Sequence, residues 1–165
     1  MKTKATAHIK AHNLHVLITI GRVVIYASPR EDYICFVSDL DVCTDGTGKH
    51  HGDNTPLDET AYNPYLNADI DKYIVVPPQV RMIPEPVVLG CQAKLTRLDS
   101  GRYYAAVCGE IGPDTKTGEA AYCLARLLNP KVTANNGDER LIYFYELWPG
   151  KAAVVDGKKY YLQPA

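Results

Sequence analysis

The stretch Gly109–Ala121, GEIGPDTKTGEAA, decides the fold that we predict for this chain of 165 residues. The segment before it, RYYAAVC, is rich in aromatic and apolar residues and predicts a strand that ends at Glu110. Gly112 and Pro113 then break the strand and turn the chain. After a second turn at Thr117–Gly118, the apolar residues of EAAYCLARLLN recur at helical spacing and predict a helix over residues 119–128.

Two carboxylates flank the Gly-Pro loop, Glu110 at the end of the predicted strand and Glu119 in the first turn of the predicted helix. Carboxylates held by two rigid elements can serve as general acid and general base. A purely structural explanation is available for Glu119, because a helix dipole stabilises a first-turn carboxylate by about 0.3–1 kcal/mol. Glu110 is harder to explain in this way, since a charge seldom ends an apolar strand. We therefore predict both glutamates as candidate catalytic residues.

Composition bounds the class of protein. The chain has a net charge of −1, with 46% hydrophobic and 22% charged residues, which predicts one globular domain over residues 1–165. A nearly neutral chain lacks the concentrated basic face of a nucleic-acid-binding protein, so we expect no nucleic-acid partner. The first 26 residues contain no continuous apolar run long enough for a signal peptide or a membrane span. From the residues alone we expect no membrane association and a cytoplasmic location.

Cysteine and histidine patterns give no sign of a metal site. There is no CxxC pair, and the odd cysteine count leaves at least one thiol unpaired. We predict buried, reduced thiols, with one disulfide left open as an alternative. A helical segment would place His8, His12 and His15 on one face, but a strand pattern follows at once and no acidic ligand accompanies them. We therefore expect neither a metal nor another cofactor. The cysteines are Cys35, Cys43, Cys91, Cys108 and Cys123.

Short strands dominate the rest of the pattern. Residues 1–12 are polar and are predicted to form an irregular lead-in, and a long acidic loop is predicted from residue 39 to residue 71. Short strands separated by turns, with one convincing helix, predict a mainly β barrel. The predicted strands cover residues 14–20, 22–27, 33–38, the YIVVPP segment at 73–78, the hairpin 87–108 with its turn at 99–101, residues 141–147, and a hairpin around 156–157.

Three motifs, in this order, resemble the fungal-type chitosanases of glycoside hydrolase family 75. They are DLDVCTDG from Asp39, YIVVPP from Tyr73 and GEIGPDTKTGEAA from Gly109, and the resemblance covers about residues 33–130. The last motif resembles the segment that carries the family's proposed catalytic pair, at the positions of Glu110 and Glu119. This chain has glutamate at position 110 where the family has aspartate, and Cys43 interrupts an acidic run of the family. The family is usually secreted.

The resemblance implies a six-stranded double-psi β-barrel and endo-hydrolysis of chitosan or a related β-1,4-linked amino-sugar polymer. An acidic cleft rimmed by Asp39, Asp41 and Asp45 would attract such a cationic polymer. We expect an inverting mechanism with Glu110 as the acid, because it ends an apolar strand, and Glu119 as the base, because a helix N-terminus favours its charged form. The alternative is a non-catalytic carbohydrate-binding barrel, a role that expansins have on a related fold.

Overall fold

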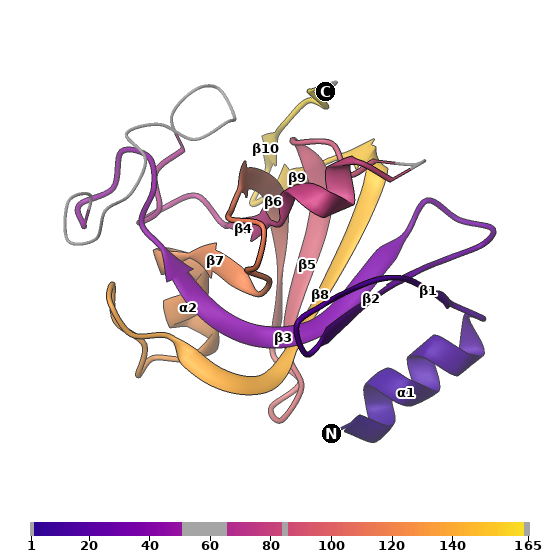
Figure 1. Ribbon diagram of the computed structural model, residues 1–165. Coiled ribbons are helices and arrows are strands. Elements are labelled where there is room, and N and C mark those ends of the chain that lie inside the picture. Colours follow the sequence, from indigo (N-terminus) through magenta and orange to yellow (C-terminus); the bar gives the residue numbers. More distant parts are fainter. Residues whose placement is uncertain (1, 51–65, 84–85, 164–165) are drawn as a thin grey trace.

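Six strands close into a barrel in the computed structural model, which describes residues 2–50, 66–83 and 86–163 (Figure 1). The pairings β3–β7 and β4–β6 are parallel, and the other pairings around the barrel are antiparallel. Because the last strand returns to the first, the barrel has no open sheet edge. The prediction of a mainly β, six-stranded barrel is confirmed. The order around the barrel is β3 (Ile34–Cys43), β7 (Glu119–Ala121), β4 (Tyr73–Val76), β6 (Tyr103–Ile111), β5 (Cys91–Arg97) and β8 (Asp138–Ala152).

Two hairpins are added to the barrel. β1 (His15–Ile20) and β2 (Val23–Ala27) pair with each other, and β2 also pairs with the start of β3. Near the C-terminus β9 (Val154–Val155) pairs with β10 (Lys158–Lys159) across a turn at residues 156–157. Both turn residues have positive φ, as the favoured two-residue hairpin turn requires. The strands predicted over residues 14–20 and 22–27 are confirmed, and so are the hairpins predicted around residues 156–157 and over residues 87–108.

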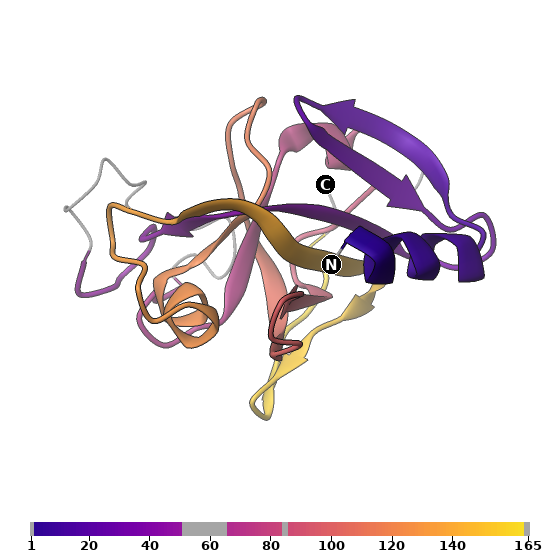
Figure 2. The ribbon, with the colours of Figure 1, turned by 90° about the horizontal axis from the view of Figure 1, so that it is seen from below.

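The irregular lead-in predicted for residues 1–12 is wrong for most of its length, because Lys2–Ala11 forms the helix α1. Figure 2 shows α1 beside the β1–β2 hairpin. The helix is held by tertiary contacts: Ala5 is buried in a cluster with Tyr33 and Phe144, and His8 Nε2 lies 2.9 Å from the Tyr33 hydroxyl. A polar segment with weak helical periodicity becomes a helix here because it packs against the barrel.

The second helix is shorter than predicted. α2 covers Tyr122–Leu128, and Glu119–Ala121, expected in its first turn, forms strand β7 instead. β7 pairs with β3 on one side and β4 on the other, and Ala120 and Ala121 are fully buried between them. Backbone pairing on both sides therefore overrides the helical spacing of these residues. Within α2, Leu124, Ala125 and Leu128 face the core, whereas Leu127 is exposed.

Strand β3 also differs from the prediction, because it continues through Cys43 rather than ending at residue 38. Asp39 and Asp41 therefore lie on a strand, not in the long acidic loop. Residues 51–65 of that loop lie outside the described residues. Along β3, Ser38 and Leu40 are fully buried while Asp39 and Asp41 are partly exposed. This alternation places both aspartates on the face of the strand turned away from the core.

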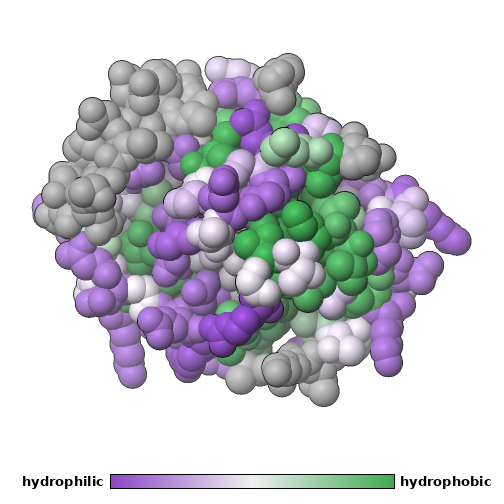
Figure 3. Space-filling model, viewed as in Figure 1, coloured by the Kyte–Doolittle hydropathy of each residue, from purple (hydrophilic) through white to green (hydrophobic). Residues whose placement is uncertain are grey.

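Apolar side chains of all six barrel strands fill the interior. The aromatic rings of Phe36 and Tyr145 stack there with their centroids 4.9 Å apart. All five cysteine thiols are free, four of them buried, which confirms the prediction of unpaired thiols. Figure 3 shows hydrophobic residues toward the side of the β1–β2 hairpin and hydrophilic residues toward the side of α2. In the described part of the chain, no helix is both long enough and apolar enough to cross a membrane.

Candidate active site

A cleft of about 630 Å³ opens at the end of β3. One wall is the end of β3 itself, and a second is the Gly-Pro loop that connects β6 to β7. The segment before β8 forms a third wall. The lining residues are Asp41, Val42, Cys43, Thr44, Asp45, Val75, Ile111, Gly112, Pro113, Lys116, Glu119, Ala134, Asn135 and Gly137.

Glu119 lies in this cleft at the first position of β7. Its backbone is in register with Asp41 of β3 on one side and with Val75 of β4 on the other. Its carboxylate lies close to the Gly-Pro loop, because a Cβ atom at Gly112 would come within 3.3 Å of Glu119 Oε2. The two neighbouring strands therefore fix the backbone of Glu119, and the loop encloses its side chain.

Burial raises the pKa of Glu119 to about 7 from its ordinary value of 4.5. Desolvation is the largest cause, since an enclosed carboxylate is less stable charged than neutral. The charges of Asp41 and Asp45 raise the pKa further, whereas the ammonium of Lys116 and a hydrogen bond from the Cys43 thiol lower it. The predicted role of base, which depended on a helix N-terminus, therefore loses its physical reason. A glutamate that keeps its proton near neutral pH suits a general acid.

Asp41 and Lys116 form an ion pair inside the cleft, with 3.0 Å between Lys116 Nζ and Asp41 Oδ2. The Asp41 side chain is 32% exposed and the Lys116 side chain 50% exposed. The backbone N–H of Asp41 donates to the Gly118 carbonyl at 2.7 Å, which ties β3 to the loop before β7. Lys116 was not among the predicted site residues, although it lies within the stretch that carries both glutamates.

Of the three aspartates predicted to rim the cleft, Asp41 and Asp45 line it and Asp39 does not. Asp39 Oδ1 accepts a hydrogen bond from the buried Ser38 hydroxyl at 3.0 Å. That hydroxyl also lies 2.9 Å from Thr117 Oγ1, in the loop before β7. Burial, together with the nearby charge of Asp41, raises the pKa of Asp39. Asp39 therefore belongs to the contacts that hold the loop against β3.

Glu110 ends β6 and is buried, with 3% of its surface exposed. It is not one of the residues that line the cleft. Its backbone is in register with Val75, the same β4 residue that pairs with Glu119 on the other side. Two steps between neighbouring strands therefore separate the backbones of the two glutamates, about 10 Å. Glu110 Oε1 accepts a hydrogen bond from the backbone N–H of Ile111 at 2.9 Å.

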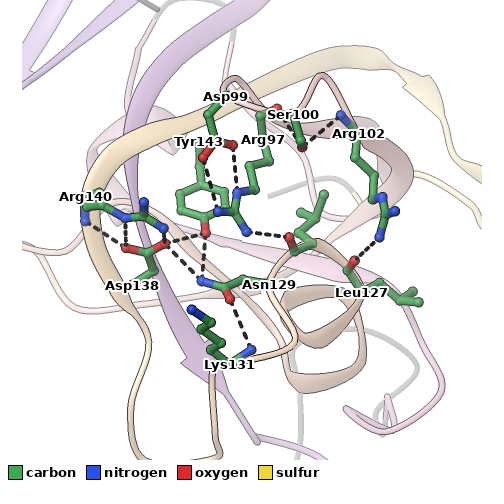
Figure 4. Close-up of polar contacts among 11 residues, drawn as sticks. Arg97, Asp99, Ser100, Arg102, Leu127, Asn129, Lys131, Asp138, Arg140 and Tyr143 are labelled. Atoms are coloured by element: carbon green, nitrogen blue, oxygen red, sulfur yellow. Dashed lines mark hydrogen bonds and ion pairs between the residues drawn. The ribbon is translucent and has the colours of Figure 1, made fainter.

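A hydrogen-bond network fixes the third wall of the cleft (Figure 4). Asp138, directly after the lining residue Gly137, accepts hydrogen bonds from Arg140 Nη2 at 2.7 Å and from the Tyr143 hydroxyl at 2.7 Å. It also accepts one from Asn129, just beyond α2, at 3.0 Å. The Arg140 guanidinium holds the pKa of Asp138 well below its usual range. The network therefore joins the start of β8 to the end of α2.

The three histidines considered as a metal face do not lie on one helix. The rings of His8 and His12 lie with their centroids 4.4 Å apart and their planes tilted by 42°, but α1 ends at Ala11 and His15 begins β1. Within the ranges that the structure describes, no three His, Cys, Asp or Glu residues are grouped so that they could hold a metal ion.

Comparison of the chain with models of protein families and with curated proteins gives no match to either.

Proposed function

We propose that this protein is a glycoside hydrolase of the chitosanase type. It cleaves internal bonds of β-1,4-linked amino-sugar polymers (endo-hydrolysis) by an inverting mechanism. The observation that carries the proposal is Glu119, a carboxyl group enclosed in a cleft with its pKa raised to about 7. Cleavage of a glycosidic bond needs an acid that is still protonated at the working pH. The resemblance of the surrounding motif to family 75 chitosanases supports the same position.

In the proposed reaction Glu119 donates its proton to the glycosidic oxygen as the bond to the sugar breaks. A second carboxylate accepts a proton from a water molecule as that water attacks the anomeric carbon from the opposite face, which inverts its configuration. We propose Glu110 for this base. Its register across β4 separates the two backbones by about 10 Å, and inverting enzymes hold their carboxyl groups roughly 6.5–9.5 Å apart. Asp45, which lines the cleft, is the alternative base.

The charge of the cleft supports an amino-sugar substrate. Asp41 and Asp45 line it, and a protonated amino-sugar polymer carries one ammonium group on each unit. Carboxylates in a partly enclosed cleft concentrate such a cation near the reacting groups.

A carbohydrate-binding barrel without activity is the second candidate. The burial of Glu110 favours it, because a carboxylate that is 3% exposed needs a local opening before it can hold the attacking water. On this hypothesis the cleft binds the polymer through the same carboxylates, and no bond is broken.

A reducing-end assay on chitosan, chitin and peptidoglycan separates the two candidates. The proposal predicts new reducing ends from chitosan and an inverted anomer as the first product. Binding of chitosan without new reducing ends would select the binding barrel.

Among variants, Glu110→Gln should lower turnover by about 10²–10⁴-fold if Glu110 is the base. Asp45→Asn should then mainly raise KM, and the reverse pattern would assign the base to Asp45.

A further inference from the structure

We infer that Lys116 is an internal competitor of the substrate, because its ammonium occupies the position on Asp41 that an ammonium group of the substrate takes when it binds. The inference deepens the proposed function and depends on it for the identity of the substrate. It concerns a different property, however: which group of the cleft recognises the amino function of the sugar.

Lys116 lies inside the cleft. Among the described residues that line the cleft it is the only lysine or arginine. It stands on the exposed loop before β7, and its side chain reaches Asp41 Oδ2 at 3.0 Å. It therefore places a primary ammonium group within the volume that the proposed substrate would enter.

The ammonium group of Lys116 is chemically similar to the protonated amino group of an amino sugar. A lysine ammonium and a protonated 2-amino group are both compact cations with three N–H donors. A carboxylate that binds one of them at hydrogen-bond distance offers suitable geometry to the other. The pair of Asp41 and Lys116 thus shows, within the protein, how the cleft binds a group of this kind.

The ion pair between Asp41 and Lys116 is weak enough for a ligand to replace the lysine. Both side chains of the pair are partly in water, with 32% of Asp41 and 50% of Lys116 exposed. Ion pairs of this kind are weak, so a ligand can displace the lysine at little cost. A substrate ammonium on Asp41 also keeps one positive charge near Glu119 when Lys116 moves away. A neutral N-acetylated unit cannot supply that charge, so the exchange favours deacetylated units.

The test compares Lys116→Gln with Lys151→Gln, which removes the same charge from an exposed position of β8 outside the cleft lining. Binding of a glucosamine hexamer and of its N-acetylated counterpart is measured by calorimetry at low and high salt. Lys116→Gln should bind the glucosamine hexamer about two- to five-fold more tightly than Lys151→Gln does, the gain expected from removing a weak internal competitor. The N-acetylated hexamer should show no gain. Equal or weaker binding of the glucosamine hexamer by Lys116→Gln would overturn the inference.

A second readout needs no sugar and keeps this inference separate from the proposed function. The pKa of Glu119, followed by carbon NMR, should rise in Lys116→Gln because the nearby ammonium is gone. Methylammonium chloride should lower it again by more than sodium chloride does at the same ionic strength. If methylammonium lowers the pKa of Glu119 in this way while no amino-sugar oligomer binds, the ammonium-binding position on Asp41 is supported and the proposed function fails. If methylammonium acts no differently from sodium, the inference fails whatever the oligomers do.

Discussion

At the scale of single residues, Glu119 combines burial with the charges of Asp41 and Asp45, and its pKa rises from 4.5 to about 7. Between these two pH values the native protein holds a proton that the unfolded chain has released. The folded state therefore loses stability as the pH rises from about 4.5 to 7, and below this range the group makes no difference. This loss of stability is the cost of a carboxyl group that is kept protonated for proton donation.

Glu119→Gln should remove this pH dependence, because glutamine stays neutral at every pH. The variant should match the wild type at pH 4.5 and exceed its free energy of unfolding by about 1–3 kcal/mol at pH 8. Urea denaturation at both values measures the difference. Glu139→Gln, at an exposed position, serves as the control and should follow the wild type at both. A variant that is less stable than the wild type at pH 8 would show that the Glu119 carboxylate stabilises the fold.

At the scale of elements, the position of β7 depends on the contacts between β3 and the loop before it. Gly118 approaches β3 closely: its φ is +77°, and a Cβ atom there would clash with Ser38 Oγ and lie 2.5 Å from the Asp39 carbonyl oxygen. Gly157, at the tip of the β9–β10 hairpin, has nearly the same φ of +79° but nothing within 4 Å of such an atom. The two glycines therefore separate backbone strain from steric clash.

Gly157→Ala should cost about 1 kcal/mol of stability, the strain of a left-handed backbone alone. Gly118→Ala should cost about 2–5 kcal/mol, because the clash with β3 adds to that strain. It should also shift the pKa of Glu119, which the same contacts position. Equal losses for the two variants, measured by urea denaturation, would mean that the approach of β3 to this loop is not tight.

The network around Asp138 fixes a different element, the segment that forms the third wall of the cleft. Since its hydrogen bonds with Arg140 lower the pKa of Asp138, the group stabilises the fold above its unfolded pKa of about 3.9, and this contribution is lost as the pH falls below that value. Asp138→Asn should lower the free energy of unfolding by roughly 2 kcal/mol at pH 7, and the difference should shrink in acid. Asp114→Asn, in the exposed loop before β7, is the control and should change little. A deficit that persists unchanged at pH 3 would point to packing rather than to charge.

At the scale of the whole molecule, local signals predicted most strands, two of the hairpins and the barrel class, because alternation and turn residues specify a hairpin within a few neighbouring residues. Strand β7 was not predictable in this way. Its three residues are a strand because β3 and β4 flank them, and those partners lie far away in the sequence. The helix α1 was missed for the same reason, since its contacts with Tyr33 and Phe144 stabilise it.

The candidate site, too, was predictable from the sequence only in part. The GEIGPDTKTGEAA stretch located Glu119, and the acidic segment located Asp41 and Asp45, because each has a sequence signal of its own. The burial of Glu110 and the raised pKa of Glu119 follow from how the strands are arranged around β4, which no local pattern encodes.

Glu119 is the general acid of the amino-sugar hydrolase that we propose. The most direct test of this role is the turnover of chitosan by the wild type and by Glu119→Gln, measured as new reducing ends at pH values from 4 to 8. We expect wild-type activity to fall as the pH rises through about 7, where Glu119 loses its proton, and Glu119→Gln to be slower by about 10²–10⁴-fold while it remains folded. A folded Glu119→Gln protein that releases reducing ends at the wild-type rate would contradict the claim.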